Sequence, residues 1–243
     1  MNNFVLMARE KQGTFAEFGG HLYDNFVKDD RWKYITNGLI VTLEITFFAV
    51  IIGIIIGFVV AIVRATYDTT GKLKIGNALC NLYLTVVRGT PIVIQLLITY
   101  FVIFGSISVD KTFVAIIAFG VNSGAYVAEI IRSGIMSIDK GQMEAGRSLG
   151  FNYIQTMAIV IMPQAFKNVL PALANEFIVL LKETSVVGYI ALEDLTKGGD
   201  IIRSRTYNAF LPLLMVAGIY LLLVMIFTTL VKKLERRMAN DGK

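Results

Sequence analysis

Long runs of apolar residues, separated by short polar segments, form the dominant pattern of this chain. An α-helix needs about 20 mostly apolar residues to cross roughly 30 Å of hydrocarbon. Three runs reach about this length without an internal charge, and a fourth does so if Glu129 is accepted near its end. The runs cover residues 45–63, 89–109, 209–231 and 112–131. Each is predicted to be a membrane-spanning helix.

Residues 148–181 are harder to interpret, because two apolar stretches are separated by Lys167 and interrupted by two prolines and Glu176. Hydropathy alone permits one span or two. Two spans would have to reverse direction within the few residues around Lys167, which leaves too little chain for a turn and two full crossings. We predict one span at about 165–185, preceded by an amphipathic helix on the cytoplasmic side. The fold class is then an all-α integral membrane protein of about five spans, with residues 1–243 as a single domain.

The composition agrees with this class. Hydrophobic residues make up 55% of the chain and charged residues 17%, whereas soluble domains average roughly 25% charged residues. The single Cys80 and single His21 argue against an intramolecular disulfide, a multi-cysteine or histidine metal site, and a Ser/His/Asp triad. A basic cytoplasmic rim explains the pI of about 9.2, so no nucleic-acid partner is expected.

Lysine and arginine counts in the loops are nearly even for the two sides, so orientation rests on one cluster. Lys232, Lys233, Arg236 and Arg237 directly follow the last apolar run and are typical of a cytoplasmic segment. Contact of this cluster with lipid headgroups would fit the same orientation. We expect an external segment at 1–34, a membrane core at 35–232 and a cytoplasmic tail at 233–243.

Several polar or small residues inside the runs have structural and functional interpretations. Arg88 is predicted to be clamped by an acidic residue such as Glu129, with substrate binding as the alternative. Glu129 and Arg132 stand three apart and are predicted to pair, with a proton relay as the alternative. Gly53 and Gly57 share a helix face that would admit a close neighbour, although glycine is generally common in membrane helices.

A polar, glycine-bracketed island occupies residues 141–150, with the sequence Gly-Gln-Met-Glu-Ala-Gly-Arg-Ser-Leu-Gly. Gly150 permits the positive φ that ends a helix, and the small Ala145 and Gly146 would let the helix fit a groove on another protein. An ordinary amphipathic connector would explain the polarity of the island. It would not explain the spacing between the island and Pro163.

The island resembles the cytoplasmic "EAA" loop of ABC transporter permeases, whose pattern is Glu-Ala-Ala, three residues, Gly, nine residues, Ile, one residue and Leu-Pro. Here the matching positions are Glu144, Ala145, Gly146, Gly150, Val160, Met162 and Pro163, with Gly, Val and Met replacing Ala, Ile and Leu. Six further segments, spread over about residues 35–232, are similar to the polar amino-acid branch of the histidine, glutamine and arginine type. They are Arg-Gly-Thr-Pro at 88–91, Ala-Tyr-Val-Ala-Glu-Ile at 125–130, Gly-Gln at 141–142, Pro-Gln-Ala at 163–165, Leu-Pro-Ala-Leu-Ala-Asn at 170–175 and Lys-Glu-Thr-Ser at 182–185.

This resemblance implies a type I ABC importer permease fold and two groups of site residues. The ATPase-coupling group lies in the segment 139–163 and comprises Gly141, Gln142, Glu144, Ala145, Gly146, Gly150 and Pro163. The substrate-pathway group comprises Lys182, Glu183, Thr184, Ser185, Asn175 and Gln95. Adjacent charges and hydroxyls are costly in lipid and would complement an amino-acid zwitterion, although simple pairing of Lys182 with Glu183 at the membrane edge is the alternative.

The chain contains no Gly-x-x-x-x-Gly-Lys-Ser/Thr loop, so it is expected to have no enzyme activity and no cofactor of its own. The resemblance places ATP and Mg²⁺ on two separate ABC ATPase subunits. It also implies a second permease copy or a homologous permease, an extracytoplasmic amino-acid-binding protein, and a location in a prokaryotic cell membrane. Two alternative functions have less support in the sequence. An ion-driven secondary transporter would favour an internal repeat, which is not seen, and a non-transporting scaffold would have little reason to hold Lys182 and Glu183 in a span.

Overall fold

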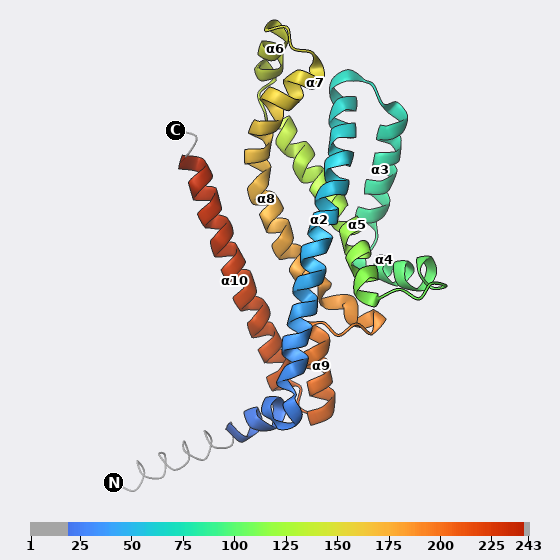
Figure 1. The fold of residues 1–243 in the computed structure, drawn as a ribbon, viewed down its shortest axis with the longest axis vertical. Coiled ribbons are helices and arrows are strands. Elements are labelled where there is room, and N and C mark those ends of the chain that lie inside the picture. Colours follow the sequence, from blue (N-terminus) through green and yellow to red (C-terminus); the bar gives the residue numbers. More distant parts are fainter. Residues whose placement is uncertain (1–18, 241–243) are drawn as a thin grey trace.

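The computed structural model describes residues 19–240, which fold into helices and the turns between them (Figure 1). The α-helices are α2 (Trp32–Thr70), α3 (Lys74–Gly89), α4 (Ile92–Ile98), α5 (Lys111–Met136), α6 (Lys140–Ser148), α7 (Tyr153–Thr156), α8 (Met162–Glu183), α9 (Leu195–Thr206) and α10 (Phe210–Asn240). Short segments of π-helix are η1 (Tyr23–Val27), η3 (Thr99–Ile103) and η4 (Met157–Ile161), and short segments of 3₁₀-helix are η2 (Lys28–Asp30) and η5 (Thr184–Ile190). The remainder of the predicted terminal segments, at 1–18 and 241–243, lies outside the described residues.

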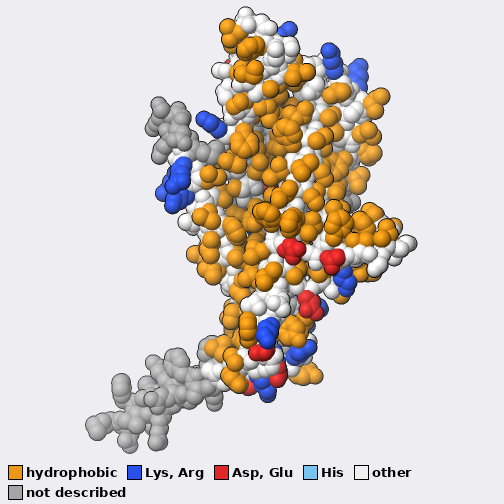
Figure 2. All heavy atoms as spheres, viewed as in Figure 1, with side chains coloured by type: hydrophobic (Ala, Val, Ile, Leu, Met, Phe, Trp, Pro, Cys, Tyr) orange, Lys and Arg blue, Asp and Glu red, His pale blue; other side chains and the backbone are white. Residues whose placement is uncertain are grey.

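Four helical stretches are long and apolar enough to cross a membrane, and they run over Trp32–Thr70, Lys111–Met136, Tyr153–Ile190 and Phe210–Arg237. A bent pair, Lys74–Gly89 with Ile92–Ile103, is a fifth candidate. Hydrophobic side chains cover most of the face seen in Figure 2, and acidic side chains gather towards its lower end. The predicted all-α membrane fold with about five spans is therefore confirmed.

The central packing of the molecule joins α2 to α5, and two glycines make it close. A Cβ atom added at Gly53 would lie 2.9 Å from Ser123 Oγ, and one added at Gly57 would lie 2.6 Å from Val127 Cγ1. Both distances are shorter than ordinary van der Waals contact. The predicted packing face on the first span is thus present, and α5 is its partner.

The second span differs from the prediction of one helix over 89–109. The chain forms α3 first, ahead of the predicted run, and then bends by 108° into α4 and η3. Thr90 and Pro91 are extended at the break, as expected where a proline constrains the residue before it. The predicted run therefore begins at the bend itself and does not form a straight helix.

The region 148–181 contributes one spanning stretch, as predicted, but this stretch begins earlier than residue 165. Helical structure is continuous from Tyr153 to Ile190 through α7, η4, α8 and η5. The wide turn η4 lies just before Pro163, where a π-type turn accommodates the missing proline N–H group. The predicted amphipathic surface helix is confined to the nine residues of α6.

The two ends of the molecule carry different elements. The inner end is defined here as the end with α6, the last turn of α2 and the start of α3, and the C-terminus of α10 points towards it (Figure 1). The outer end is the opposite one, where α9 packs beside the start of α2 and the described chain begins. The segment 139–150 and the basic cluster at 232–237 therefore lie towards the same end, as the predicted orientation requires.

Candidate functional site: the inner-end helix and the paths leading from it

The helix α6 is short, and both of its ends are stabilised. Asp139 caps the start, where its Oδ1 atom accepts a hydrogen bond from Gly141 N at 2.7 Å. At the other end Gly150 has the predicted positive φ, +85°. The N–H groups of Gly150 and Phe151 donate to the carbonyl oxygens of Arg147 and Gly146, which is the Schellman pattern. The helix is therefore well defined despite its nine residues.

One face of α6 is exposed and the other rests on the body of the protein. Glu144 and Ala145 are exposed, and Leu149, just past the end of the helix, is 77% exposed. Gly146 is buried instead, and a Cβ atom at this position would lie 2.5 Å from Thr156 Cγ2. The prediction that Gly146 fits a groove on another protein is wrong, because this glycine provides the close contact between α6 and α7.

The island is tied to the following span by polar contacts. Asn152 and Gln155 form a capping box that begins α7, with both hydrogen bonds at 2.9 Å. Gln164 Nε2 lies 3.4 Å from Gln142 Oε1, between α8 and α6. Because Gly146 also contacts Thr156, α6 packs directly on the start of the spanning stretch Tyr153–Ile190.

A network of four charges joins α2 to α5 near the inner end. Glu129 pairs with Arg64 and also with Arg132, the latter at 3.2 Å, and Arg132 lies 3.5 Å from Asp68. The predicted pair of Glu129 with Arg132 is therefore present. The four side chains are 19–33% exposed, so these ion pairs are partly shielded from water.

Arg88 does not join this network, so the predicted clamp to Glu129 is wrong. Its guanidinium carbon lies 5.8 Å from the centre of the Tyr126 ring, an arrangement that permits a cation–π interaction. Arg88 stands at the end of α3 next to the bend, away from the inner end where α3 begins. Instead of Arg88, the arginine that pairs with Glu129 from another helix is Arg64, near the inner end of α2.

The Lys-Glu-Thr-Ser segment lies where α8 tightens into η5. Lys182 is exposed, while Glu183 and Ser185 are half-buried. Thr184 is fully buried and donates to Leu181 O at 2.9 Å, so it faces the protein core and is not available to a solute in this structure. No ion pair between Lys182 and Glu183 occurs among the residues that the structure describes.

Gln95 has a structural role at the helix break. Its Nε2 group lies 2.7 Å from Val87 O and 3.0 Å from Thr90 O, both acceptors in the bend between α3 and α4. Its Oε1 atom accepts from Asn122 Nδ2 of α5 at 3.0 Å. The side chain is therefore engaged within the protein, which does not favour the predicted place in the substrate pathway.

Two polar side chains inside the bundle were not predicted to form a pair. Glu176 of α8 is 8% exposed and accepts a hydrogen bond from Ser123 Oγ of α5 at 2.9 Å. Asn175, the neighbouring predicted pathway residue, is exposed. Because Asn175 and Lys182 stand seven residues apart on α8, they share one helix face, while Glu176 and Glu183 share the adjacent one. The signal in the sequence was a carboxylate within an apolar stretch, which must find a partner in a membrane helix.

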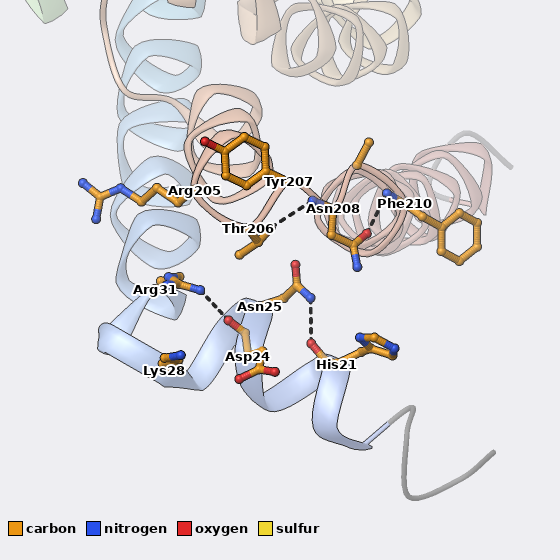
Figure 3. Close-up of a pocket in the computed structure, with 11 residues that line it drawn as sticks. His21, Asp24, Asn25, Lys28, Arg31, Arg205, Thr206, Tyr207, Asn208 and Phe210 are labelled. Atoms are coloured by element: carbon orange, nitrogen blue, oxygen red, sulfur yellow. Dashed lines mark hydrogen bonds between the residues drawn. The ribbon is translucent and has the colours of Figure 1, made fainter. Parts of the chain in front are cut away.

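At the outer end, the start of the described chain and the α9–α10 junction enclose a polar pocket of about 610 Å³ (Figure 3). Lys28 and Arg31 line one side, and Arg205 and Tyr207 line the other. Tyr207 is 97% exposed although its φ is +54°, a value that costs a bulky residue roughly 1–2 kcal/mol. The protein therefore holds an aromatic side chain outwards at this end. Within residues 19–240, no three His, Cys, Asp or Glu side chains are placed to hold a metal ion.

The chain matches known proteins over most of its length. It is 39% identical over 207 residues to a putative glutamine transport system permease protein of Rickettsia typhi, covering 84% of this chain and 93% of the relative. It is 40% identical to the arginine transport system permease protein ArtQ of Bacillus subtilis, covering 86% of this chain and 94% of the relative. The glutamine transport system permease protein of Escherichia coli K12 is 34% identical and is covered to 92%.

Solved structures agree with these matches. A crystal structure of an amino acid ABC transporter with histidines superposes with a TM-score of 0.77 at 43% identity, and the match covers 84% of this chain and 94% of that chain. The MetNI methionine ABC transporter in an inward-facing conformation shares the fold, with a TM-score of 0.74 at 21% identity. The family model described as "Binding-protein-dependent transport system inner membrane component" matches residues 50–240, so this chain belongs to that family of ABC transporter permeases.

Proposed function

We propose that this chain is the membrane-spanning half of an ATP-driven importer of polar amino acids, with the ATPase on separate subunits. Relatives that carry the names of glutamine and arginine transport permeases support this substrate class. Two permease chains, identical or homologous, enclose the pathway, and each presents α6 to one of two ATPase subunits. ATP binding at those subunits shifts the population between inward-open and outward-open forms.

The coupling proposal rests on the way α6 packs on the body of the protein. Glu144 stands on an exposed helix that is capped at both ends, and Gly146 on the opposite face contacts Thr156 of the following span. A short, well-ordered helix of this kind suits transmission of a movement from a partner protein. The exposed Glu144 and Ala145 are the surface offered to the ATPase, and Gly141, Gln142, Gly150 and Pro163 position that surface.

The substrate pathway is proposed along the face of α8 that holds Asn175 and Lys182. Glu183 and Ser185 stand beside that face at the α8–η5 junction, where they supply a carboxylate and a hydroxyl. An amino-acid zwitterion presents an ammonium and a carboxylate, which Glu183 and Lys182 complement in charge. Thr184 and Gln95 are left out of the pathway, because both are engaged in internal hydrogen bonds.

An external amino-acid-binding protein is the proposed partner at the outer end. The pocket there displays Arg205 and Tyr207, and arginine and tyrosine are enriched among the residues that dominate protein interfaces. Substitution of Arg205 by Glu is expected to weaken stimulation of the ATPase by the binding protein while basal ATP hydrolysis stays unchanged. The proposed orientation places this end, and the N-terminus, outside the cell, with the C-terminus in the cytoplasm of a prokaryotic cell.

The test is the charge reversal Glu144→Lys, measured in proteoliposomes that contain the permease, the ATPase and the binding protein. We expect loss of ATPase association and of ATP-dependent amino-acid uptake, with normal insertion into the membrane. Glu235→Lys is the matched control, because it makes the same charge change at an exposed position of α10. Normal uptake by Glu144→Lys would contradict the docking role. Uptake driven by an ion gradient without any ATPase would overturn the proposed function itself.

A further inference from the structure

An apolar groove lies between α2 and the start of the spanning stretch Tyr153–Ile190. Its volume is about 680 Å³, and its walls are mostly hydrophobic. Phe58 and Ile62 of α2 form one wall, and Met157 and Ala158 of η4 form the other. The apolar run that includes Phe58 and Ile62 ends at Arg64, so this part of the groove lies at hydrocarbon depth.

The mouth of the groove is polar and lies towards the inner end. Thr70, Lys72 and Asn152 line it. Thr70 stands eight positions after Ile62, or about 12 Å along the helix, and this distance carries the groove from the hydrocarbon into the headgroup region. The groove therefore crosses the same boundary between apolar and polar surroundings that a phospholipid crosses.

Two of the three polar residues at the mouth, Lys72 and Asn152, have well-defined backbone positions. Lys72 lies in the turn between α2 and α3, flanked by Gly71 and Leu73, whose φ values are +67° and +62°. Asn152 Oδ1 accepts a hydrogen bond from Gln155 N, which fixes the amide. Among the described residues, neither the Lys72 ammonium nor the Asn152 amide nitrogen has a hydrogen-bond partner, so both can donate to an added group.

We propose that this groove binds one anionic phospholipid, with an acyl chain between α2 and η4 and its phosphate at Lys72 and Asn152. An acyl chain matches the apolar walls, and a phosphodiester accepts hydrogen bonds from an ammonium and an amide. The ammonium favours a lipid of net negative charge over a zwitterionic one. We place this lipid in the cytoplasmic leaflet, and that placement rests on the proposed function and orientation. The expectation that the groove retains a lipid does not depend on either.

The position of the groove gives the lipid a link to α6. Met157 directly follows Thr156, the last residue of α7 and the residue that Gly146 contacts, and Tyr153 and Ile154 of α7 also line the groove. A lipid that fills the groove braces η4 against α2. In membranes that contain the anionic lipid, the surface on which α6 packs is then more rigid. ATP hydrolysis is coupled to uptake more tightly in those membranes.

The first test measures lipid retention by native mass spectrometry of the purified permease–ATPase complex, equilibrated with phosphatidylglycerol or phosphatidylcholine. We expect preferential retention of phosphatidylglycerol. Asn152→Asp keeps the helix cap, because Asp is an equally good N-cap, but places a carboxylate where the phosphate would lie. It is expected to weaken retention about tenfold, the loss that corresponds to one hydrogen bond to a charged group. Lys74→Gln is the control, since Lys74 does not line the groove.

A second pair of variants tests the apolar part of the groove. Ala158→Trp fills the groove and should abolish retention, whereas Ile159→Trp places the same side chain at an exposed neighbouring position that does not line the groove and should retain the lipid. Assembly of each complex, followed by size-exclusion chromatography, identifies variants that fail to fold. Equal retention of the two lipids, or unchanged retention in both Asn152→Asp and Ala158→Trp, would overturn the proposal. Loss of uptake with lipid retention intact would count against the proposed function and not against the groove.

Discussion

Substitution of Gly146 by Ala directly tests the close packing of α6 on Thr156. The change would restore the Glu-Ala-Ala pattern of the family, so sequence resemblance alone predicts an improvement or no effect. The structure predicts the opposite, because the new Cβ atom would lie 2.5 Å from Thr156 Cγ2 and 3.0 Å from Thr156 Oγ1. Ordinary carbon–carbon contact begins near 3.5 Å, so α6 and α7 must separate by about 1 Å.

The magnitude follows from two opposed effects. Overpacking of a close contact costs roughly 1–3 kcal/mol. The higher helix propensity of Ala offsets this by about 0.8–1 kcal/mol. The net cost is therefore about 0–2 kcal/mol, centred near 1 kcal/mol, in the local stability of α6 where it packs on α7. Thr156→Ser removes the clashing methyl group and keeps the hydroxyl that donates to Asn152 O at 3.0 Å, so the double variant should recover much of the loss.

The assay is amide hydrogen exchange over residues 140–150 of the assembled complex, read together with ATPase association. Gly146→Ala should exchange faster by about fivefold, and the double variant should exchange at a rate near that of Thr156→Ser alone. Ser148→Ala serves as a control, because it raises helix propensity at an exposed position of the same helix. The reasoning is refuted if Gly146→Ala exchanges as slowly as the wild type, or if Thr156→Ser brings no recovery.

Three further outcomes are expected from the packing and the charges. Gly57→Ala should destabilise the protein in micelles by about 1–3 kcal/mol because of its contact with Val127, whereas Gly218→Ala, with nothing within 4 Å, should change the free energy of unfolding little; similar melting temperatures would count against the packing argument. Glu129→Gln should cost about 1–3 kcal/mol by the same measurement, since it removes the shared partner of two arginines; a neutral result would show that the network adds no stability. Asp194 caps α9, and burial raises the pKa of its carboxyl. The stability of the wild type relative to Asp194→Asn should therefore fall as the pH rises above the ordinary pKa of 3.8, whereas Asp194→Ala, which lacks the cap, should be about 0.5–2 kcal/mol less stable than Asp194→Asn at every pH. Parallel pH profiles for wild type and Asp194→Asn would contradict this.

The sequence predicted those features that depend on local patterns. Hydropathy located the spans of α2, α5 and α10, because a buried or lipid-facing helix must be apolar along its length. The spacing of Glu129 and Arg132 predicted their pair, and Gly150 predicted the end of α6, since both effects act within one or two turns. These predictions did not need any knowledge of the tertiary fold.

The features that were missed depend on contacts between distant residues. Arg64 and Glu129 are separated by 65 positions, and no local pattern indicates that they meet. The 108° bend was not predicted either, although Pro91 marked its place, because the side chain of Gln95 stabilises the bend by bonding across it and to α5. Gly146 was assigned to the wrong partner for the same reason, since its neighbour Thr156 is reached only after the chain reverses.

The uninterrupted length of α2 has a mechanical consequence. Its 39 residues extend for about 58 Å, nearly twice the roughly 30 Å of hydrocarbon that it crosses. One end carries Arg64 and Asp68 of the charge network. At the other end Gly38 packs against the backbone of Asp194 and Leu195, where α9 begins. A tilt of about 10° around the middle of such a stiff rod would displace each tip by about 5 Å in opposite directions. Closure at one surface of the membrane and opening at the other are thereby linked within a single helix.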